Sequence, residues 1–258
     1  MRPRYEPTGA AIFTAKMGFI TRRIFYEFYS SGDQRNTQKH WLNLERRGLF
    51  KHYFSPTKQD TLVLSEYKNE ISSPEVAAIV SPPHVGVHNH DETLGRIVLR
   101  CQRQELIRSW TSEAELKKIV ATEFKLEGSR QTAKYPDALV QLNVPGPPVN
   151  VAFELELSRK KLKRYEDVAF AYQFIKPVKA VFFICINDEI IRAIQTAFRR
   201  ARFPSHEKPV GFALASEWLF DPTNTRLEMP TRRTTFGCLV SEISEKRSQS
   251  EEAKNAIV

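Results

Sequence analysis

The stretch from Lys134 to Tyr165, KYPDALVQLNVPGPPVNVAFELELSRKKLKRY, decides the fold, because it reads as a strand, a loop, a second strand and a basic helix. Within Val149–Ser158, apolar residues alternate with polar ones, and this period of two is typical of a half-buried strand. Glu154 and Glu156 are two residues apart in this pattern. We therefore expect both carboxylates on one face of the strand.

Another strand is predicted in the segment PDALVQL, which starts at Pro136. Proline lacks an N–H, and the first position of a strand tolerates this. Asp137 is then expected at the start of that strand. If the two strands are neighbours, Asp137, Glu154 and Glu156 converge, and carboxylate oxygens of this kind suit Mg²⁺ or Mn²⁺. Such an ion would activate water and stabilise a phosphate group.

The same stretch resembles the core of the PD-(D/E)xK nuclease superfamily, because Pro136-Asp137 and Glu154-Leu155-Glu156 match the two halves of its motif. The chain departs from that motif at Glu156, which stands where the superfamily usually has a lysine. Some restriction enzymes of this superfamily have a glutamate there, and in other members the lysine lies on the next helix. We expect Lys161 rather than Lys160, since Lys161 shares a predicted helical face with Tyr165. The alternative is a solvated strand edge rich in Glu and Lys.

Composition and charge favour a polyanionic partner. The 258 residues are enough for one large domain or two modest ones, and the net charge of +9 with a pI near 9.5 suits nucleic acid or an anionic membrane surface. The longest apolar run, Ala180–Ile186, is too short to span a bilayer, and no basic helix has a strong apolar face. Cys101, Cys185 and Cys238 form no CxxC pair. We therefore expect a reduced cytoplasmic protein with no membrane association, structural zinc or disulfide.

Residues 1–72 are expected to form a winged-helix DNA-binding domain. Apolar spacing predicts a helix over Met17–Tyr29 with Thr21 as its N-cap. Asn36 or Thr37 would cap a second helix that stops at Gly48, and a β-ribbon follows over residues 49–54 and 61–64. In such a domain the second helix faces a DNA groove and nearby cations contact phosphates. The residues expected at DNA are Arg35, Gln38, Lys39, Asn43, Arg46 and Lys58. The alternative is a winged helix that serves protein docking or dimerisation.

Residues 84–220 are expected to form a mixed α/β domain, α+β for the chain as a whole. The predicted order is helix, three strands, helix, strand, helix, strand, which agrees with the PD-(D/E)xK core. The first of these strands leads into Glu113, a candidate for one more carboxylate of the site, with Glu115 as the alternative. Either residue could instead stabilise a helix N-terminus. Residues 221–258 are expected to be a peripheral, partly disordered segment.

Taken together, the ordered motifs resemble the replication-relaxation family. The features that carry this resemblance are Gly48-Leu49-Phe50, the histidine-led segment His84–Cys101, Trp110 to Glu113, Asp137, and Glu154 to Glu156. The resemblance implies association with DNA of a plasmid or other mobile element, in replication or transfer. The partner that we expect is double-stranded DNA, with a second copy of the chain or proteins of replication and transfer as further partners.

Two hypotheses follow for the second domain. In the first, it is a metal-dependent DNA endonuclease: Asp137 and Glu154 bind Mg²⁺ or Mn²⁺, Glu156 completes the site or orients water, and Lys161 stabilises the phosphate. Glu113 is the additional catalytic candidate. In the second, the protein is a non-catalytic DNA-binding accessory factor or transcription regulator that keeps the fold as a platform. The three carboxylates favour the first hypothesis, and the missing motif lysine favours the second.

Overall fold

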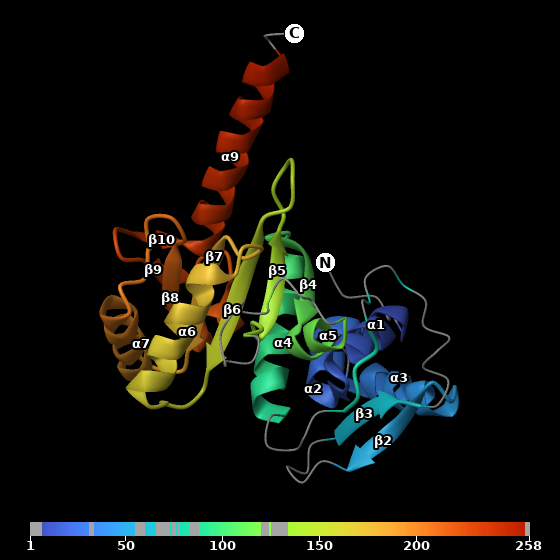
Figure 1. The fold of residues 1–258 in the computed structure, drawn as a ribbon. Helices are drawn as coiled ribbons and strands as arrows, with labels where there is room; N and C mark the ends of the chain where they lie inside the picture. Colours follow the sequence, from blue (N-terminus) through green and yellow to red (C-terminus); the bar gives the residue numbers. More distant parts are fainter. Residues whose placement is uncertain are drawn as a thin grey trace. The chain divides into compact units, whose positions relative to one another are not determined.

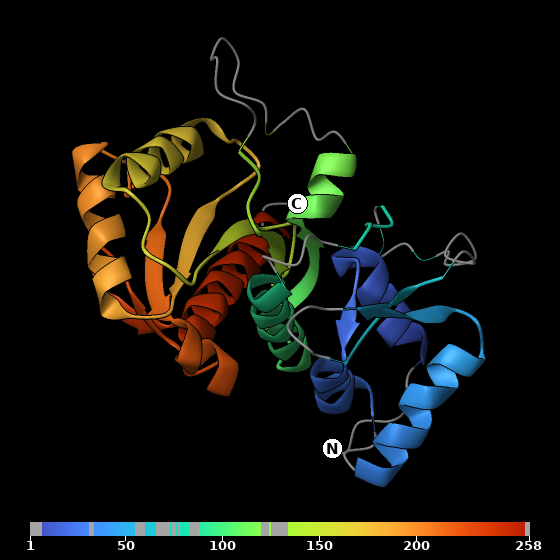
Figure 2. The ribbon, with the colours of Figure 1, turned by 90° about the horizontal axis from the view of Figure 1, so that it is seen from below.

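The chain divides into two compact units in the computed structural model, which describes residues 7–30, 34–54, 60–65, 73, 76, 78–82, 88–119, 124 and 134–255. Unit 1 comprises Met1–Leu99 with Ala114–Val120, and unit 2 comprises Arg100–Glu113 with Ala121–Val258. The division falls inside helix α4 (His88–Arg103). Figures 1 and 2 show the ribbon from two sides.

Unit 1 contains a small antiparallel sheet and several helices. Its elements in chain order are α1 (Pro7–Met17), β1 (Ile20–Thr21), α2 (Arg22–Ile24), the π-helix η1 (Phe25–Tyr29), α3 (Gln34–Arg46), β2 (Phe50–Phe54), β3 (Asp60–Leu64), the first part of α4 and most of α5 (Glu113–Lys118). The strands pair in the order β1-β3-β2, so β3 is central. Ile20 of β1 pairs with Leu62, and Phe50 of β2 pairs with Leu64.

The first predicted helix of this unit begins later than its apolar spacing indicates. Thr21 is the N-cap, as predicted, because its hydroxyl accepts a hydrogen bond from the N–H of Ile24 at 3.2 Å. The helix does not begin at Met17, since Ile20 and Thr21 pair with β3 as a strand. The prediction missed this strand because it is only two residues long and no alternation can be read from two positions.

The second predicted helix, α3, begins at Gln34, before the expected caps at Asn36 and Thr37. Thr37 is buried inside the helix, and its hydroxyl lies 2.8 Å from that of Ser30. The helix ends where predicted: Gly48 has a φ of +74° and its N–H donates to the carbonyl of Glu45 at 2.9 Å. The predicted hairpin of β2 and β3 is confirmed.

The core of unit 1 is aromatic. Trp41 of α3 is 1% exposed, and its ring centroid lies 5.4 Å from that of Phe25. On α4, Gly95 allows a close approach, because a Cβ there would lie 2.7 Å from the Phe13 ring. Arg96, on the same helix, donates to Glu27 at 2.9 Å. These contacts place the first part of α4 in unit 1.

Unit 2 is built on a mixed seven-stranded sheet with the strand order β10-β9-β8-β7-β6-β5-β4. Its strands are β4 (Ile107–Ser112), β5 (Ala138–Leu142), β6 (Asn150–Glu156), β7 (Ala180–Cys185), β8 (Val210–Leu214), β9 (Arg226–Glu228) and β10 (Arg233–Thr235). The neighbours β6, β7 and β8 run parallel, and all other neighbours run antiparallel. The expected mixed α/β class is therefore confirmed.

Helices cover both faces of this sheet (Figures 1 and 2). Helices α6 (Leu162–Phe174) and α7 (Asp188–Arg200) lie on one face, and α8 (Ala215–Phe220) and α9 (Phe236–Asn255) lie on the other. Consecutive residues of β7 show the two layers. The ring centroid of Phe183 lies 5.2 Å from that of Phe198 on α7, and that of Phe182 lies 5.7 Å from that of Phe236 on α9.

Strand β6 is not the half-buried strand that its alternation predicted. It lies between β5 and β7, and every residue from Val151 to Glu156 is buried. Glu154 and Glu156 are each 4% exposed, because α6 covers the face that carries them. The alternative of a solvated strand edge is therefore wrong for these two residues.

The segment after Pro222 is not the peripheral, partly disordered tail that its composition predicted. It supplies β9 and β10 to the sheet and the 20-residue helix α9. At the start of α9, Phe236 is fully buried, with its ring centroid 4.7 Å from that of Trp218 and 5.9 Å from that of Phe153. Most residues that follow Phe236 in α9 are polar or charged, and this composition predicted disorder although Phe236 fixes the start of the helix.

Candidate functional site

Three carboxylate residues lie in one row across the ends of neighbouring strands. Ala138 of β5 pairs with Phe153 of β6, and continuing this register places Asp137 beside Glu154. On the other side, the N–H of Glu113 donates to the carbonyl of Asp137 at 3.0 Å. We call Glu113, Asp137 and Glu154 the carboxylate row. The two strands are neighbours, which is the condition for Asp137 and Glu154 to lie side by side.

Lys134 and Tyr172 both contact Glu154, and neither residue was among the predicted site residues. The ammonium of Lys134 lies 2.7 Å from Oε1 and 2.9 Å from Oε2 of Glu154, and it also donates to the carbonyl of Tyr135 at 2.8 Å. The hydroxyl of Tyr172, on α6, donates to Oε1 of Glu154. Both carboxylate oxygens of Glu154 therefore accept hydrogen bonds within the protein.

Burial controls the protonation of this cluster. It raises the pKa of Glu154 to about 7, with Asp137 adding to the effect and Lys134 opposing it. For the Lys134 ammonium, burial lowers the pKa, but the charges of Glu154 and Asp137 outweigh burial, so that the net pKa is raised. Burial also raises the pKa of Tyr172 well above its ordinary value. Lys134 is therefore a cation at neutral pH, while Glu154 exchanges its proton near neutrality.

Glu156 points into the same buried layer and pairs with Lys160, not with Lys161. The Lys160 ammonium lies 2.7 Å from Oε1 of Glu156, whereas Oε2 is buried and has no hydrogen-bond partner among the described residues. Burial raises the pKa of Glu156, and Lys160 opposes the rise. The predicted helical face for Lys161 does not exist, because α6 begins only at Leu162 and Lys161 is its exposed N-cap.

The contacts of these carboxylates test whether the residues fit a divalent ion. Asp137 accepts a hydrogen bond from the N–H of Leu155 at 2.8 Å, and Lys134 and Tyr172 donate to Glu154. In the part of the chain that the structure describes, no three His, Cys, Asp or Glu side chains gather closely enough to hold a metal. In this structure Lys134 and Tyr172 contact the oxygens of Glu154, and a site for Mg²⁺ or Mn²⁺ at Asp137 and Glu154 stays a prediction.

The two acidic candidates at the start of α5 have different surroundings. Glu113 lies next to Asp137, and its charge acts on Lys134 and Tyr172. Glu115 is fully buried in unit 1, where its carboxylate lies 3.4 Å from the ammonium of Lys16. Of the two candidates, Glu113 is therefore the one beside the carboxylate row, and Glu115 holds a buried ion pair.

The residues predicted to contact DNA lie on α3, except Lys58, which is outside the described residues. Arg35, Lys39 and Arg46 are exposed and follow the spacing i, i+4, i+11, so they share one side of the helix. We call these three residues the basic face of α3. Gln38 is half-buried and its amide oxygen accepts a hydrogen bond from Arg22. Asn43 is half-buried beside them.

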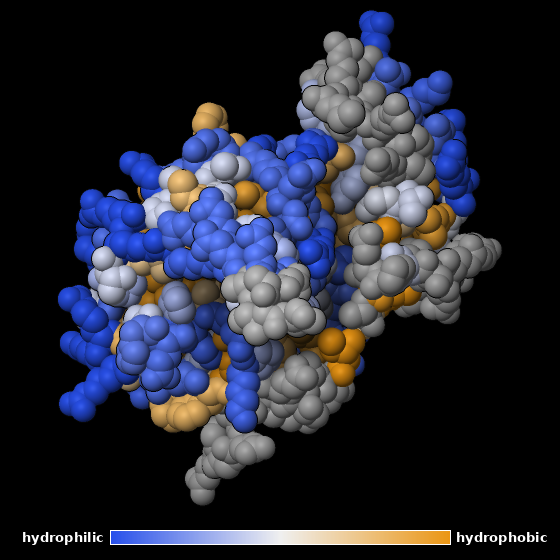
Figure 3. Space-filling model, turned by 90° about the horizontal axis from the view of Figure 1, so that it is seen from above, coloured by the Kyte–Doolittle hydropathy of each residue, from blue (hydrophilic) through white to orange (hydrophobic). Residues whose placement is uncertain are grey.

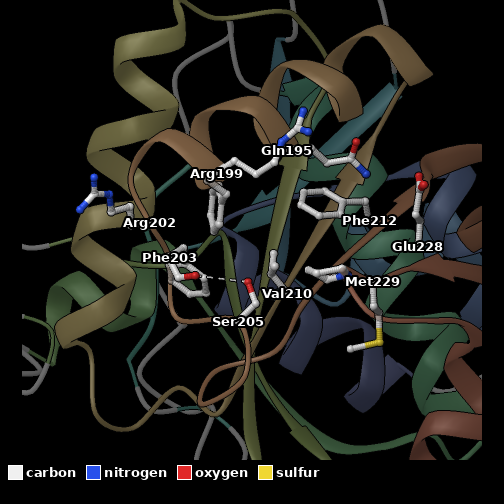
Figure 4. A pocket seen from close by; sticks show the side chains of 11 residues that line it. Gln195, Arg199, Arg202, Phe203, Ser205, Val210, Phe212, Glu228 and Met229 are labelled. Carbon is white, nitrogen blue, oxygen red and sulfur yellow. Dashed lines mark hydrogen bonds between the residues drawn. The ribbon is translucent and has the colours of Figure 1, made fainter.

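Away from the carboxylate row, the structure has a cavity beside α7 and a largely hydrophilic surface. A cavity of about 400 Å³ is lined by apolar side chains, among them Phe198, Val210 and Phe212, and by polar ones such as Gln195 and Glu228. Figure 4 shows this cavity from close by. No residue of the carboxylate row lines this cavity. Hydrophilic residues cover most of the face shown in Figure 3, where hydrophobic residues form small separate patches. No helix among the described residues is long and apolar enough to cross a membrane.

Comparison with known proteins returns no relative: no family model, no curated protein and no solved structure matches the chain. The geometry described above is therefore the basis on which a function is inferred. Membership of the replication-relaxation family stays a prediction based on ordered motifs.

Proposed function

We propose that the chain is a DNA-binding protein whose unit 1 is a winged helix that places α3 in a groove of duplex DNA. The observation that carries this proposal is the basic face of α3. Trp41 and Leu44 are buried on the opposite side of the same helix. The cations are thus presented outward by a helix that is anchored in the core of its unit.

Dimensions and topology support the same proposal. An α-helix with its side chains is about 10–12 Å across, and the major groove of B-DNA is about 12 Å wide. The order of α2 with η1, α3 and the β2–β3 hairpin is the one expected of a winged helix. Gln38 is held by Arg22, so we assign base contacts to Asn43 and phosphate contacts to the basic face of α3.

Charge removal on α3 tests this function. We expect Arg35→Gln, Lys39→Gln and Arg46→Gln each to weaken binding to duplex DNA and to reduce the slope of log affinity against log salt by about 1 per lost phosphate contact. Fluorescence anisotropy with a labelled duplex at several salt concentrations measures both quantities. The control is Lys246→Gln, which removes the same charge from an exposed position of α9. Equal losses in the control and the α3 variants would refute a role for α3.

We further propose that this binding serves replication or transfer of a plasmid or other mobile element, with unit 2 as a PD-(D/E)xK-like domain. The support is the order of its central elements: the antiparallel strands β4, β5 and β6, the helix α6, and then β7 parallel to β6. This order of strands and helix, with Asp137 directly before β5 and Glu154 on β6, agrees with the one expected of a PD-(D/E)xK core.

A metal-dependent DNA endonuclease is the second candidate function, and the carboxylate row is the observation that favours it. The contacts of Glu154 with Lys134 and Tyr172 favour instead a non-catalytic DNA-binding accessory factor or transcription regulator. We adopt the accessory factor, because both oxygens of Glu154 are already hydrogen-bonded within the protein.

Cleavage assays separate these two candidates. Supercoiled and linear DNA are incubated with Mg²⁺ or Mn²⁺ and with the wild type, Asp137→Ala, Glu154→Ala or Lys134→Met, and binding is measured on the same DNA. We expect binding without cleavage for all four proteins. Metal-dependent nicking that is lost in Asp137→Ala and Glu154→Ala, while binding persists, would establish the endonuclease and overturn the non-catalytic assignment.

A further inference from the structure

Two phenylalanines form an exposed aromatic pair on α6. Phe170 is 48% exposed and Phe174, one turn later, is 56% exposed. Their ring centroids are 4.9 Å apart, with the ring planes at 60°. The same helix buries Tyr165 and Tyr172 toward the sheet, so the pair lies on the outer side. Two large aromatic rings side by side on a surface are typical of an interaction site and not of a solvated helix face.

The Phe170 end of the pair is electrically balanced. A hollow of about 410 Å³ beside Phe170 is lined by two cations and two carboxylates. Each cation has an acidic partner: the ammonium of Lys163 lies 3.0 Å from Asp167, and the guanidinium of Arg200 lies 3.8 Å from Glu166. This end therefore offers little net attraction for an anion.

The Phe174 end is positively charged. Lys176 and Lys179 are exposed, and no described residue forms an ion pair with either. Lys208 donates to the carbonyl of Ile175 at 2.6 Å, directly after Phe174. Burial lowers the pKa of Lys208, and the charge of Lys179 lowers it further, so these cations lie close enough to repel one another. Like charges gathered at one place are complementary to an anionic partner.

We propose that α6 binds single-stranded DNA, with unpaired bases stacked on Phe170 and Phe174 and the phosphate backbone at Lys176 and Lys179. Aromatic rings beside cations are the two elements that single-strand binding needs, since every base has a stackable face. Duplex DNA keeps its bases stacked on one another, and so it cannot use the rings. The proposal rests on the proposed function only in taking DNA as the ligand.

Leucine and alanine variants test the stacking. The probe is a short oligothymidylate that contains one 2-aminopurine, whose fluorescence changes when the base stacks on an aromatic ring. We expect Phe170→Leu and Phe174→Leu each to weaken binding of this oligonucleotide about 10-fold, and Phe174→Ala to do the same. Leucine keeps the apolar character but lacks the ring. Phe220→Ala is the matched control, because Phe220 is 85% exposed on α8 and should leave affinity unchanged.

Further variants test whether the positive charge at the Phe174 end, and not the balanced Phe170 end, contributes to binding. Lys176→Gln with Lys179→Gln should weaken single-strand binding and its salt dependence, whereas Lys163→Gln, at the balanced end, should change neither. Duplex affinity measured on the same proteins should be unaffected, so that failure of the α3 assignment and failure of the α6 assignment are distinguishable. Unchanged oligonucleotide affinity in the leucine variants would overturn the proposal. So would dimerisation by light scattering that disappears in Phe174→Leu, because the rings would then bind a second copy.

Discussion

The protonation of the Glu154 carboxyl group depends on two opposing effects: burial favours the protonated form, and Lys134 favours the carboxylate. Its pKa is raised to about 7, mainly by burial, while an unfolded glutamate titrates near 4.3. Between these values the folded chain holds a proton that the unfolded chain has lost. The contribution of Glu154 to stability is therefore complete at acidic pH and is lost as the pH rises to about 7.

We expect this loss to be on the order of 3 kcal/mol in the free energy of unfolding. Urea denaturation of the wild type and Glu154→Gln at pH 4.5, 6 and 7.5 measures it. The stability of the wild type relative to Glu154→Gln should fall across this range. Glu252→Gln, an exposed position on α9, controls for the loss of one carboxylate. If the difference in the free energy of unfolding between the wild type and Glu154→Gln does not change with pH, the pKa of Glu154 is not raised by burial.

At this scale the sequence predicts the carboxylates better than their partners. Asp137 and Glu154 lie side by side, as strand pairing requires, because register follows from the backbone. Lys134 was missed because its contact with Glu154 depends on the reach of a long side chain across 20 residues of sequence. Tyr172 was missed because its contact depends on how α6 docks on the sheet.

The end of α7 shows a helix cap with an unusual residue. The backbone N–H of Phe203 donates to the carbonyl of Phe198 at 3.1 Å, and the backbone N–H of Arg202 donates to the carbonyl of Arg199 at 3.1 Å. These are the two hydrogen bonds of a Schellman motif. Arg202 has a φ of +51°, where glycine is normally preferred. The backbone therefore carries strain at a position that a Cβ disfavours.

We expect Arg202→Gly to stabilise unit 2 by up to about 1 kcal/mol. The matched control is Ala201→Gly at the preceding residue, whose φ of −70° suits alanine. This variant should lower the free energy of unfolding by up to about 1 kcal/mol. Urea denaturation followed by circular dichroism compares the two variants with the wild type. A loss of stability in Arg202→Gly would mean that contacts of the arginine outweigh the backbone strain.

Elements with a strong period were predictable, and short or concealed ones were not. The helical spacing of Ile190, Ile194 and Phe198 predicts a helix over residues 188–200, and α7 spans Asp188–Arg200 with Asn187 as its N-cap. Strands β9 and β10 have three residues each and show no pattern to read. The sequence of residues 105–111 predicts the first strand of the sheet, and this strand, β4, occupies Ile107–Ser112. It begins later because Glu105 is in a turn with a φ of +55°.

At the scale of the whole molecule, the chain passes between its two units three times. The passages fall after Leu99, Glu113 and Val120, so neither unit is one continuous stretch of sequence. Strand β4 is at the edge of the unit 2 sheet, next to β5. Between these two strands the chain enters unit 1 after Glu113 and returns to unit 2 after Val120. Serine- and proline-rich stretches at residues 71–74 and 81–83 predict one linker, and the sequence has no comparable signal at the later passages.

Fragments test how much unit 2 depends on β4. We expect residues 121–258 to unfold at a lower urea concentration than residues 100–258, because the shorter fragment lacks β4 and exposes the edge of β5. It also loses the buried Trp110, which is 4% exposed in the intact chain. Circular dichroism and size-exclusion chromatography compare the two fragments. Equal midpoints would show that the sheet is stable without its edge strand.

The aromatic cores have an optical consequence. The chain has three tryptophans, all buried: Trp41 lies in unit 1, and Trp110 and Trp218 lie in unit 2. Indole emission shifts to longer wavelength when water reaches the ring. A chain with Trp110→Phe and Trp218→Phe would therefore emit from unit 1 alone, and one with Trp41→Phe from unit 2 alone. Each half of the molecule thus carries its own built-in spectroscopic reporter.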